Sequence, residues 1–223
     1  MEKKIEEKNT DMGNVITRSE EFIQKNQKTL IIAICAILVV IIAVFGLRRW
    51  YFQPRQERAA AEMYAAEQWY AQGEYMKALD GDDTYRGFTS VASDYKGTKS
   101  GNLACYYAGI CNLQLGNYEE AIHWLKKYNG KDLLTSAMAT IALGDAQMES
   151  GDMAAATANY MKAAKMNTNF VTTPTALFKA GMGYMMQEDY KKALDCFKQV
   201  KNYPESTEYN DIDRYIAIAE AEK

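Results

Sequence analysis

The chain has 223 residues, enough for one or two domains, and its charged and hydrophobic shares are those of an ordinary folded protein. Residues 50–223 hold 18 basic and 23 acidic residues, a formal balance of −5, which argues against nucleic-acid binding. The sequence has no glycine-rich phosphate loop, nucleophile elbow or zinc-ligand spacing. We therefore predict that the protein is not an enzyme and takes no metal, cofactor or small-molecule substrate.

Residues 1–29 form a charged tail. Lys and Glu alternate through Met1 to Lys8, and six basic residues balance six acidic ones over the whole tail. This composition predicts a solvated and partly disordered segment. The alternative is that Ser19 to Lys28, with Phe22 and Ile23 on one side, forms a short helix at a membrane surface.

Residues 30–47 carry no charge, and as a helix they would extend about 27 Å, close to the hydrocarbon thickness of a bilayer. Lys25 and Lys28 precede this stretch, and the cations and aromatics of Arg48 to Phe52 follow it, as suits the headgroup region. A buried helix of a soluble core, the alternative, would usually keep a polar stripe. The sequence therefore predicts an uncleaved transmembrane helix.

The same stretch suits neither a cleaved signal peptide nor a lipoprotein anchor. A signal peptide has a shorter apolar core and a small-residue cleavage site, which is absent here. Cys35 does not suit lipid attachment, because Ile34 precedes it and it lies early in the apolar run. Three basic residues lie close before the span and four close after it, so charge leaves the orientation open.

Residues 48–223 are predicted to form a helical-repeat domain. Gln53 to Ala71 are rich in Ala and Glu and predict a helix, which Pro54 kinks away from the anchor. The segment 55–101 contains degenerate hairpins, in which a helix from Gly73 is cut short at Asp80 to Asp83. A further helix, followed by a loop over residues 96–101, carries one apolar face at helical spacing: Tyr85, Phe88, Val91 and Tyr95.

Three copies of one pattern follow, at about residues 102–135, 137–171 and 174–203. In each copy a glycine in the first helix precedes a turn, and an alanine follows early in the second helix, at intervals of 35 and 37 residues. Such periods indicate stacked helical hairpins. We expect each glycine to face its alanine, and a bulky residue four positions after the alanine to fill the space beside the next repeat. In chain order, the glycine, alanine and bulky residue of each copy are Gly109, Ala121 and Leu125, then Gly144, Ala156 and Tyr160, and then Gly181, Ala193 and Phe197.

A last amphipathic helix, over residues 206–222, follows Pro204. Its apolar residues are Tyr209, Ile212, Ile216 and Ala219. Because a solenoid must close its terminal apolar surface, we predict that this helix is a cap.

The repeat pattern resembles the tetratricopeptide repeat. Leu143-Gly144 stands where that family has its Leu-Gly pair, weakened to Ala108-Gly109 and Ala180-Gly181 in the other copies, and Tyr184 provides the following aromatic in the third. The resemblance implies an all-α fold with a single N-terminal transmembrane helix followed by a tetratricopeptide-type solenoid of helical hairpins. It also implies a binding scaffold rather than a catalyst.

The resemblance further implies that the first helix of each hairpin lines a concave groove. By spacing, these helices present one predominantly apolar face as candidate peptide-binding or partner-binding residues: Leu103, Tyr106, Ile110, Leu113, Met138, Ile141, Met148, Phe178, Met182 and Met185. Asp145 is the one acid on it, and Met side chains would let the groove adapt to varied partners. The alternative is that flanking helices bury these residues as ordinary core.

The remaining residues of chemical interest favour no reaction. His123 has no cysteine or carboxylate at metal-ligand spacing, so we expect a surface or packing role. Cys105 and Cys111 lie six residues apart in one helix and point to different faces, so no disulfide is expected there. Cys196 belongs to another helix. Some tetratricopeptide-repeat proteins bind the terminal carboxylate of a chaperone through Lys, Arg and Asn on this face. Only Lys179 lies near it here, so we do not expect that activity.

The whole layout resembles the ancillary subunit of the bacterial Sec translocon. The matching stretches are Phe22 to Lys28 before the span, Arg49 to Tyr51 after it, and Gly73 to Ala78. The resemblance implies a single-pass protein of the bacterial inner membrane with a periplasmic C-terminal domain, and the Sec translocon and periplasmic chaperones as partners. The alternatives are a membrane-tethered scaffold for assembling an envelope complex and an organelle import receptor with the repeats facing the cytosol.

Overall fold

The computed structural model describes residues 2–166 and 168–222, with side chains described from Lys25 onward. Its described elements are helices, and the strand-like pairing found among them is an isolated bridge between Gly81 and Arg86. The chain divides into two compact units, residues 1–54 and residues 55–223. The prediction of an all-α protein built of helical hairpins is confirmed.

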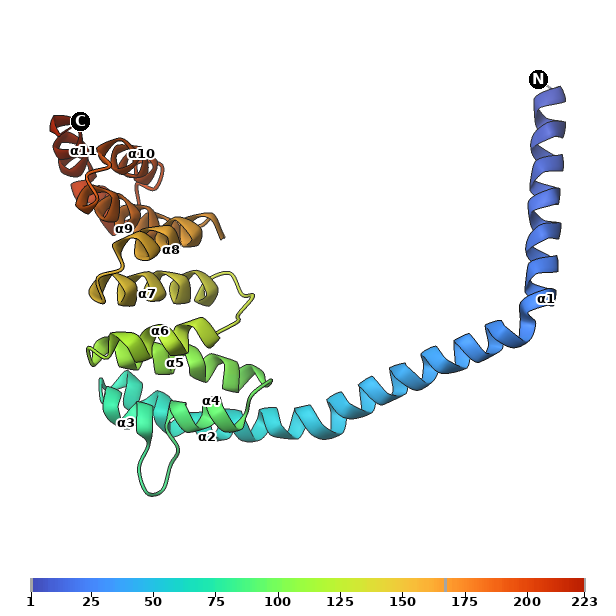
Figure 1. The fold of residues 1–223 in the computed structure, drawn as a ribbon, viewed down its shortest axis with the longest axis horizontal. Helices are drawn as coiled ribbons and strands as arrows, with labels where there is room; N and C mark the ends of the chain where they lie inside the picture. Colours follow the sequence, from blue (N-terminus) through green and yellow to red (C-terminus); the bar gives the residue numbers. More distant parts are fainter. Residues whose placement is uncertain (1, 167, 223) are drawn as a thin grey trace. The chain divides into compact units, whose positions relative to one another are not determined.

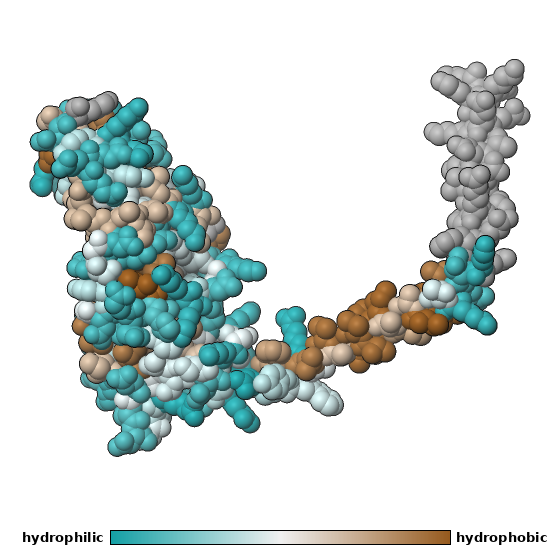
Figure 2. Space-filling view, viewed as in Figure 1, coloured by the Kyte–Doolittle hydropathy of each residue, from teal (hydrophilic) through white to brown (hydrophobic). Residues whose placement is uncertain are grey.

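The first unit is one long helix, α1 (Glu2–Leu47), followed by the five-residue π-helix η1 (Arg48–Phe52). The helix extends back through the tail for which disorder was expected, because Glu and Lys are strong helix formers and no proline occurs before Pro54. Its apolar segment has a mean hydropathy of 3.4 and none of it is buried. Figure 2 shows this apolar band along the helix, which is long and apolar enough to cross a membrane.

Pro54 does not end the helical path. The amide of Gln53 donates to the carbonyl of Arg48, five residues earlier, and α2 (Gln53–Ala71) continues directly from that π-helical turn. Proline has no amide hydrogen to donate to the carbonyl four residues before it, so a change of hydrogen-bond register just before Pro54 is physically reasonable.

The second unit begins with α2, α3 (Tyr75–Asp80) and α4 (Phe88–Asp94). Ala66 of α2, Ala78 of α3 and Phe88 of α4 are fully buried and belong to one apolar cluster that continues into α5. The residue four positions after Ala78 is Asp82, where the complete repeats have a bulky apolar residue. The second helix of this hairpin therefore has no anchor there and ends at Asp80.

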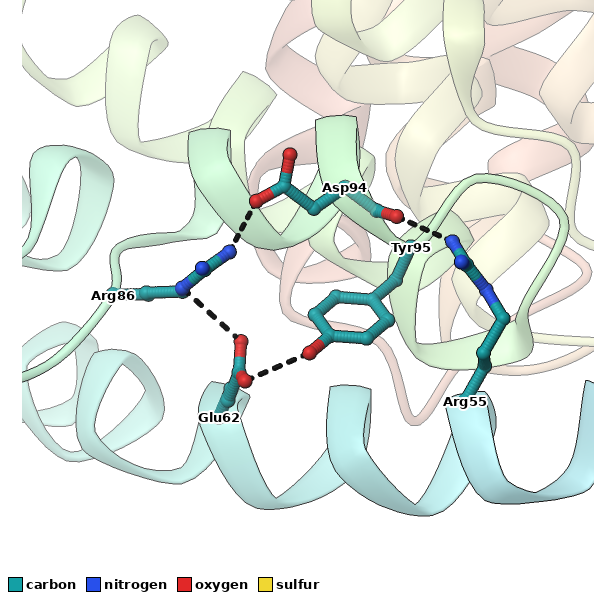
Figure 3. Close-up of polar contacts among 5 residues, drawn as sticks. All are labelled: Arg55, Glu62, Arg86, Asp94 and Tyr95. Atoms are coloured by element: carbon teal, nitrogen blue, oxygen red, sulfur yellow. Dashed lines mark hydrogen bonds and ion pairs between the residues drawn. The ribbon is translucent and has the colours of Figure 1, made fainter.

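Polar contacts also attach α2 to α4 and to the segments flanking α4 (Figure 3). The Tyr95 hydroxyl donates to Glu62 at 2.7 Å, and the second oxygen of Glu62 lies 3.4 Å from Arg86 Nε. Arg86 also pairs with Asp94. Arg55 donates to the main-chain carbonyl of Asp94 at 2.5 Å, so both ends of α4 are connected to α2.

Three complete hairpins follow and stack one on the next (Figure 1). The first is α5 (Lys99–Gln114) with α6 (Tyr118–Lys127), and the second is α7 (Thr135–Glu149) with α8 (Met153–Met166). The third is α9 (Thr172–Met186) with α10 (Tyr190–Val200). Besides the contacts within each hairpin, α5 contacts α7 and α7 contacts α9, so the first helices form a continuous row.

Each hairpin turns through one residue in the left-handed region. That residue is Gly116 at φ 76°, Gly151 at φ 92° and, in the third hairpin, Glu188 at φ 59°. Gly73, at φ 78°, has the same place between α2 and α3. Glycine adopts this conformation without the steric cost that a side chain adds, so Glu188 is the strained member of the series.

The closest packing inside each hairpin differs from the expected pairing of glycine with alanine. A Cβ atom on Gly109, Gly144 or Gly181 would come within 2.4–2.5 Å of a side-chain atom of the bulky residue four positions after the alanine: Leu125, Tyr160 and Phe197 respectively. These bulky residues therefore fill the space beside the glycine, and Leu125 also joins a core cluster with Ala139 and Ala142 of α7 in the next hairpin, as expected. The glycine makes room for them within its own hairpin.

The C-terminal segment covers the last hairpin through the 3₁₀-helix η2 (Thr207–Asp211) and α11 (Ile212–Ala221). Ile212 is 1% exposed and joins the core cluster of α9 and α10. The Tyr215 ring packs edge-on to Phe178 of α9 with their centroids 4.9 Å apart. This helix thus buries the end of the repeat stack, as a capping helix does.

Candidate functional site

The candidate partner-binding residues lie on the first helices of the hairpins, α5, α7 and α9. Tyr106 and Ile141 are each only 8% exposed and belong to core clusters. Seven others are half-buried and pack against those clusters: Leu103, Ile110, Leu113, Met148, Phe178, Met182 and Met185. Met138 is the exposed member of the set, at 46%.

A pocket of about 440 Å³ opens where the four helices of the first two hairpins, α5 to α8, meet α9. Leu113 and Met148, both candidate residues, line it with Asp145. The other residues that line it are Gln114, Tyr118, Glu149, Tyr160 and Lys179. The face is therefore open at the C-terminal ends of α5 and α7, and its lining combines two apolar side chains with several polar ones.

Asp145 lies at the centre of this pocket. One oxygen, Oδ1, accepts from the Tyr160 hydroxyl at 2.8 Å and from Lys179 Nζ at 2.8 Å. Asp145 belongs to α7, Tyr160 to α8 and Lys179 to α9, so a single carboxylate connects two successive hairpins. Because Asp145 and Lys179 have side chains 28% and 37% exposed, both charges still reach solvent inside the pocket.

The surroundings of Tyr160 keep its hydroxyl protonated. Burial raises its pKa, and the nearby Asp145 carboxylate, which accepts its hydrogen bond, raises the pKa further. The hydroxyl therefore acts as a fixed hydrogen-bond donor at neutral pH. An amphipathic partner would meet two apolar side chains, Leu113 and Met148, beside an aligned Asp145–Lys179 ion pair.

Sequence reasoning passed over several lining residues although the repeat period marks them. Gln114 and Glu149 are 35 residues apart, the same interval that separates Leu113 from Met148. Because the candidate residues were chosen as apolar positions, Gln114 and Glu149, which directly follow Leu113 and Met148, were excluded. Spacing gives Tyr160 a packing role alone, and its hydroxyl contact with Asp145 depends on the approach of α8 to α7, which spacing does not reveal.

The histidine and the cysteines of the second unit lie in surface or packing positions. His123 is exposed and its ring lies edge-on to Trp124, with the centroids 5.5 Å apart. Cys105, Cys111 and Cys196 are buried free thiols, and burial raises the pKa of Cys111 to about 12 and that of Cys196 to about 11. Among the side chains described, those of residues 25–166 and 168–222, no group of three His, Cys, Asp or Glu is arranged to hold a metal ion.

Comparison with known proteins agrees with this geometry. Residues 141–170, from the middle of α7 to just beyond α8, match the tetratricopeptide repeat family. The chain therefore contains a tetratricopeptide repeat, the unit of scaffolds that bind proteins and peptides. No curated protein matches the chain.

Proposed function

We propose that this protein is a membrane-anchored binding protein that receives peptide segments of partner proteins on the face formed by α5, α7 and α9. The pocket around Leu113, Met148 and Asp145 carries the proposal, because it is a concavity on the row of first helices where apolar and charged side chains reach solvent together. An occupant would place an apolar side chain against Leu113 and Met148. Its backbone or polar groups would meet Asp145 and Lys179.

The anchor in this proposal is the uncharged stretch from Leu30 to Leu47. Its large side chains are exposed along the helix, with Ile42 at 69% and Phe45 at 70%, an arrangement that is costly in water and favourable in lipid. Trp50, Tyr51 and the two arginines before them would lie at the headgroup level.

Within this class we propose the role of an ancillary factor of the bacterial Sec translocon. The supporting observation is the order of segments, a charged N-terminal helix, one apolar span, a basic and aromatic turn, and then helical hairpins. In that role the second unit would lie in the periplasm and pass emerging chains to chaperones. Assembly of an envelope complex would need the same binding face and a different partner.

Site-specific photocrosslinking tests the binding face. A photoreactive residue in place of Gln114, which is exposed in the pocket, should crosslink to partner proteins in native membranes. The same residue in place of Glu120, exposed on α6 and absent from the lining of this pocket, is the matched control and should give little crosslinking. Because the proposed anchor is an apolar side chain against Leu113 and Met148, and Asp145 and Lys179 already neutralise each other, the yield should change little between low and moderate salt.

A substitution at the pocket separates binding from folding. Leu113→Ser together with Met148→Ser should reduce crosslinking from position 114 while the chain keeps its helical circular dichroism. A folded double variant that crosslinks as strongly as the parent would refute the proposed binding face. Recovery of translocon subunits among the crosslinked proteins would support the Sec role, and recovery of a different envelope complex would replace it.

A further inference from the structure

A second pocket, of about 520 Å³, lies at the N-terminal end of α5. The end of α4, residues 96–99, the first turns of α5 and the end of α6 form its walls. No residue that lines it also lines the pocket around Asp145.

The floor of this second pocket is apolar. It includes Trp124, Cys105 and Ala92, which are 8%, 7% and 3% exposed and belong to one core cluster. Trp124 presents a small exposed part of its indole here, against which an aromatic or aliphatic side chain of a partner can pack. Such a side chain would extend an existing core cluster.

Three lysines surround this floor, Lys96, Lys99 and Lys127, and no acidic residue lines the pocket. All three are exposed, and Lys127 Nζ lies 4.1 Å from the centroid of the Trp124 ring. Both Lys96 and Lys127 act electrostatically on the buried Cys105 thiol, lowering its pKa against the larger effect of burial, which raises it. Lys96 and Lys127 therefore both lie near the apolar surface that Cys105 and Trp124 form.

These three lysines also lack acidic partners within the described chain. Only some of the other cations of the same unit form ion pairs within the described residues: Lys77, Arg86, Lys179, Lys192, Lys198 and Lys201. No carboxylate of residues 25–166 or 168–222 lies within ion-pair distance of Lys96, Lys99 or Lys127. In a unit whose formal balance is negative, a cluster of unpaired positive charges repels itself and attracts an anionic partner.

The backbone donors at the start of α5 are already engaged. Thr98 Oγ1 accepts from the Gly101 amide at 3.0 Å, and Gln56 Oε1 accepts from the Ser100 amide at 3.1 Å. A phosphate held by the helix end would need those donors free. The positive charge of this pocket therefore comes from exposed side chains above an apolar floor, which suits carboxylates flanking an apolar residue better than a compact phosphate.

We propose that this pocket docks an acidic segment of a partner protein, with one large apolar side chain on Trp124 and carboxylates beside Lys96, Lys99 and Lys127. The segment is thus an acidic peptide with an aromatic or aliphatic anchor. Attraction between exposed charges weakens with added salt, so docking here is salt-sensitive, in contrast to the face around Leu113 and Met148.

The test uses the full chain in detergent micelles and fluorescently labelled pentapeptides with blocked ends. Fluorescence anisotropy should show binding of Glu-Asp-Phe-Asp-Glu and at least tenfold weaker binding of Gln-Asn-Phe-Asn-Gln and of Glu-Asp-Ala-Asp-Glu. The triple variant K96Q/K99Q/K127Q should lose at least tenfold in affinity. The matched control K162Q/K165Q/K191Q, which removes equal charge from exposed lysines elsewhere, should stay within twofold of the parent.

Opposite results overturn the proposal. Equal weakening in both triple variants would show a response to net charge alone, and tight binding of the neutral peptide would show that the lysines are not used. Displacement of the acidic peptide by glycerophosphoserine at lower concentrations than by its unlabelled self would identify a lipid headgroup as the occupant. The variant L113S/M148S should bind the acidic peptide normally. This result distinguishes a failure of the lysine-pocket proposal from a failure of the proposed binding face around Leu113 and Met148.

Discussion

Tyr160 of α8 lies directly against Gly144 of α7. A Cβ atom on Gly144 would come within 2.5 Å of Tyr160 Cε1 and within 3.1 Å of the Ala156 carbonyl oxygen. The same ring ends in the hydroxyl that donates to Asp145. One side chain thus fixes the spacing of the second hairpin and orients the carboxylate at the centre of the candidate binding pocket.

Replacing Gly144 by Ala should destabilise the protein although alanine is the better helix former. Inside a helix this change normally stabilises by about 0.5–1 kcal/mol. Here the added methyl overlaps the Tyr160 ring, and overpacking typically costs about 1–3 kcal/mol. Urea unfolding should therefore show a net loss. In a Tyr160→Ala background the same glycine change should lose its penalty; an unchanged penalty there would show that the ring is not the obstacle.

Glu188→Gly should stabilise the third hairpin. Glu188 has φ 59° where the other complete hairpins have glycine, and a non-glycine residue in this region costs about 1–2 kcal/mol. The greater flexibility of glycine in the unfolded chain offsets part of that gain. Thermal unfolding should give a higher Tm for Glu188→Gly and a lower Tm for Gly151→Ala, which introduces the same strain in the second hairpin. A lower Tm for Glu188→Gly would show that backbone strain at Glu188 does not limit stability.

Stability should decline in alkaline solution. Burial raises the pKa of Tyr106 and of Tyr128 to about 12, and the pKa of Tyr160 is raised as well. Above pH 10 the unfolded chain loses tyrosine protons that the folded chain retains, so the free energy of unfolding falls as the pH rises. Tyr160→Phe should make this decline shallower in denaturant melts between pH 9 and about 11.5, and an unchanged slope would show that Tyr160 does not contribute to it.

Glu62→Ala should loosen α2 from the rest of the second unit. It removes the acceptor of the Tyr95 hydroxyl and the ion-pair partner of Arg86. Because the Glu62 side chain is 34% exposed, we expect a loss of about 1 kcal/mol, less than for a fully buried charged hydrogen bond. Trypsin should then cut faster after Arg58. Tyr95→Phe should cost a similar amount, and the double variant should cost less than both losses added together, since one hydrogen bond is shared.

Carbonate extraction checks the proposed anchor. The full chain should remain with the membrane pellet, whereas a chain beginning at Gln53 should be soluble. Val39→Lys with Ile41→Lys should release the full chain, because each lysine at the centre of a span costs about 2.5–3.5 kcal/mol. Release of the unmodified chain by carbonate would refute the anchor.

The sequence by itself determined the helices of the repeats, their pairing and the apolar segment. These features follow from local causes: the absence of proline and charge from Leu30 to Leu47, and a small residue seven positions before each turn. A turn residue free to adopt positive φ and an alanine five positions later complete each repeat. Because such signals recur at a nearly fixed period, the sequence alone shows where Gly144 stands within its repeat. Gly144 lies inside residues 141–170, which match the tetratricopeptide repeat family.

Only the tertiary structure decided which residue faces each glycine and which part of the first-helix row stays open. Tyr160 against Gly144, and Tyr215 over Phe178, depend on the angles at which neighbouring helices cross, and spacing within one helix contains no information about those angles. The Lys96, Lys99 and Lys127 cluster likewise joins a loop to the ends of two helices. Periodicity predicts which residues share a helix face. Burial and charge clustering arise between helices, where side chains from separate segments meet.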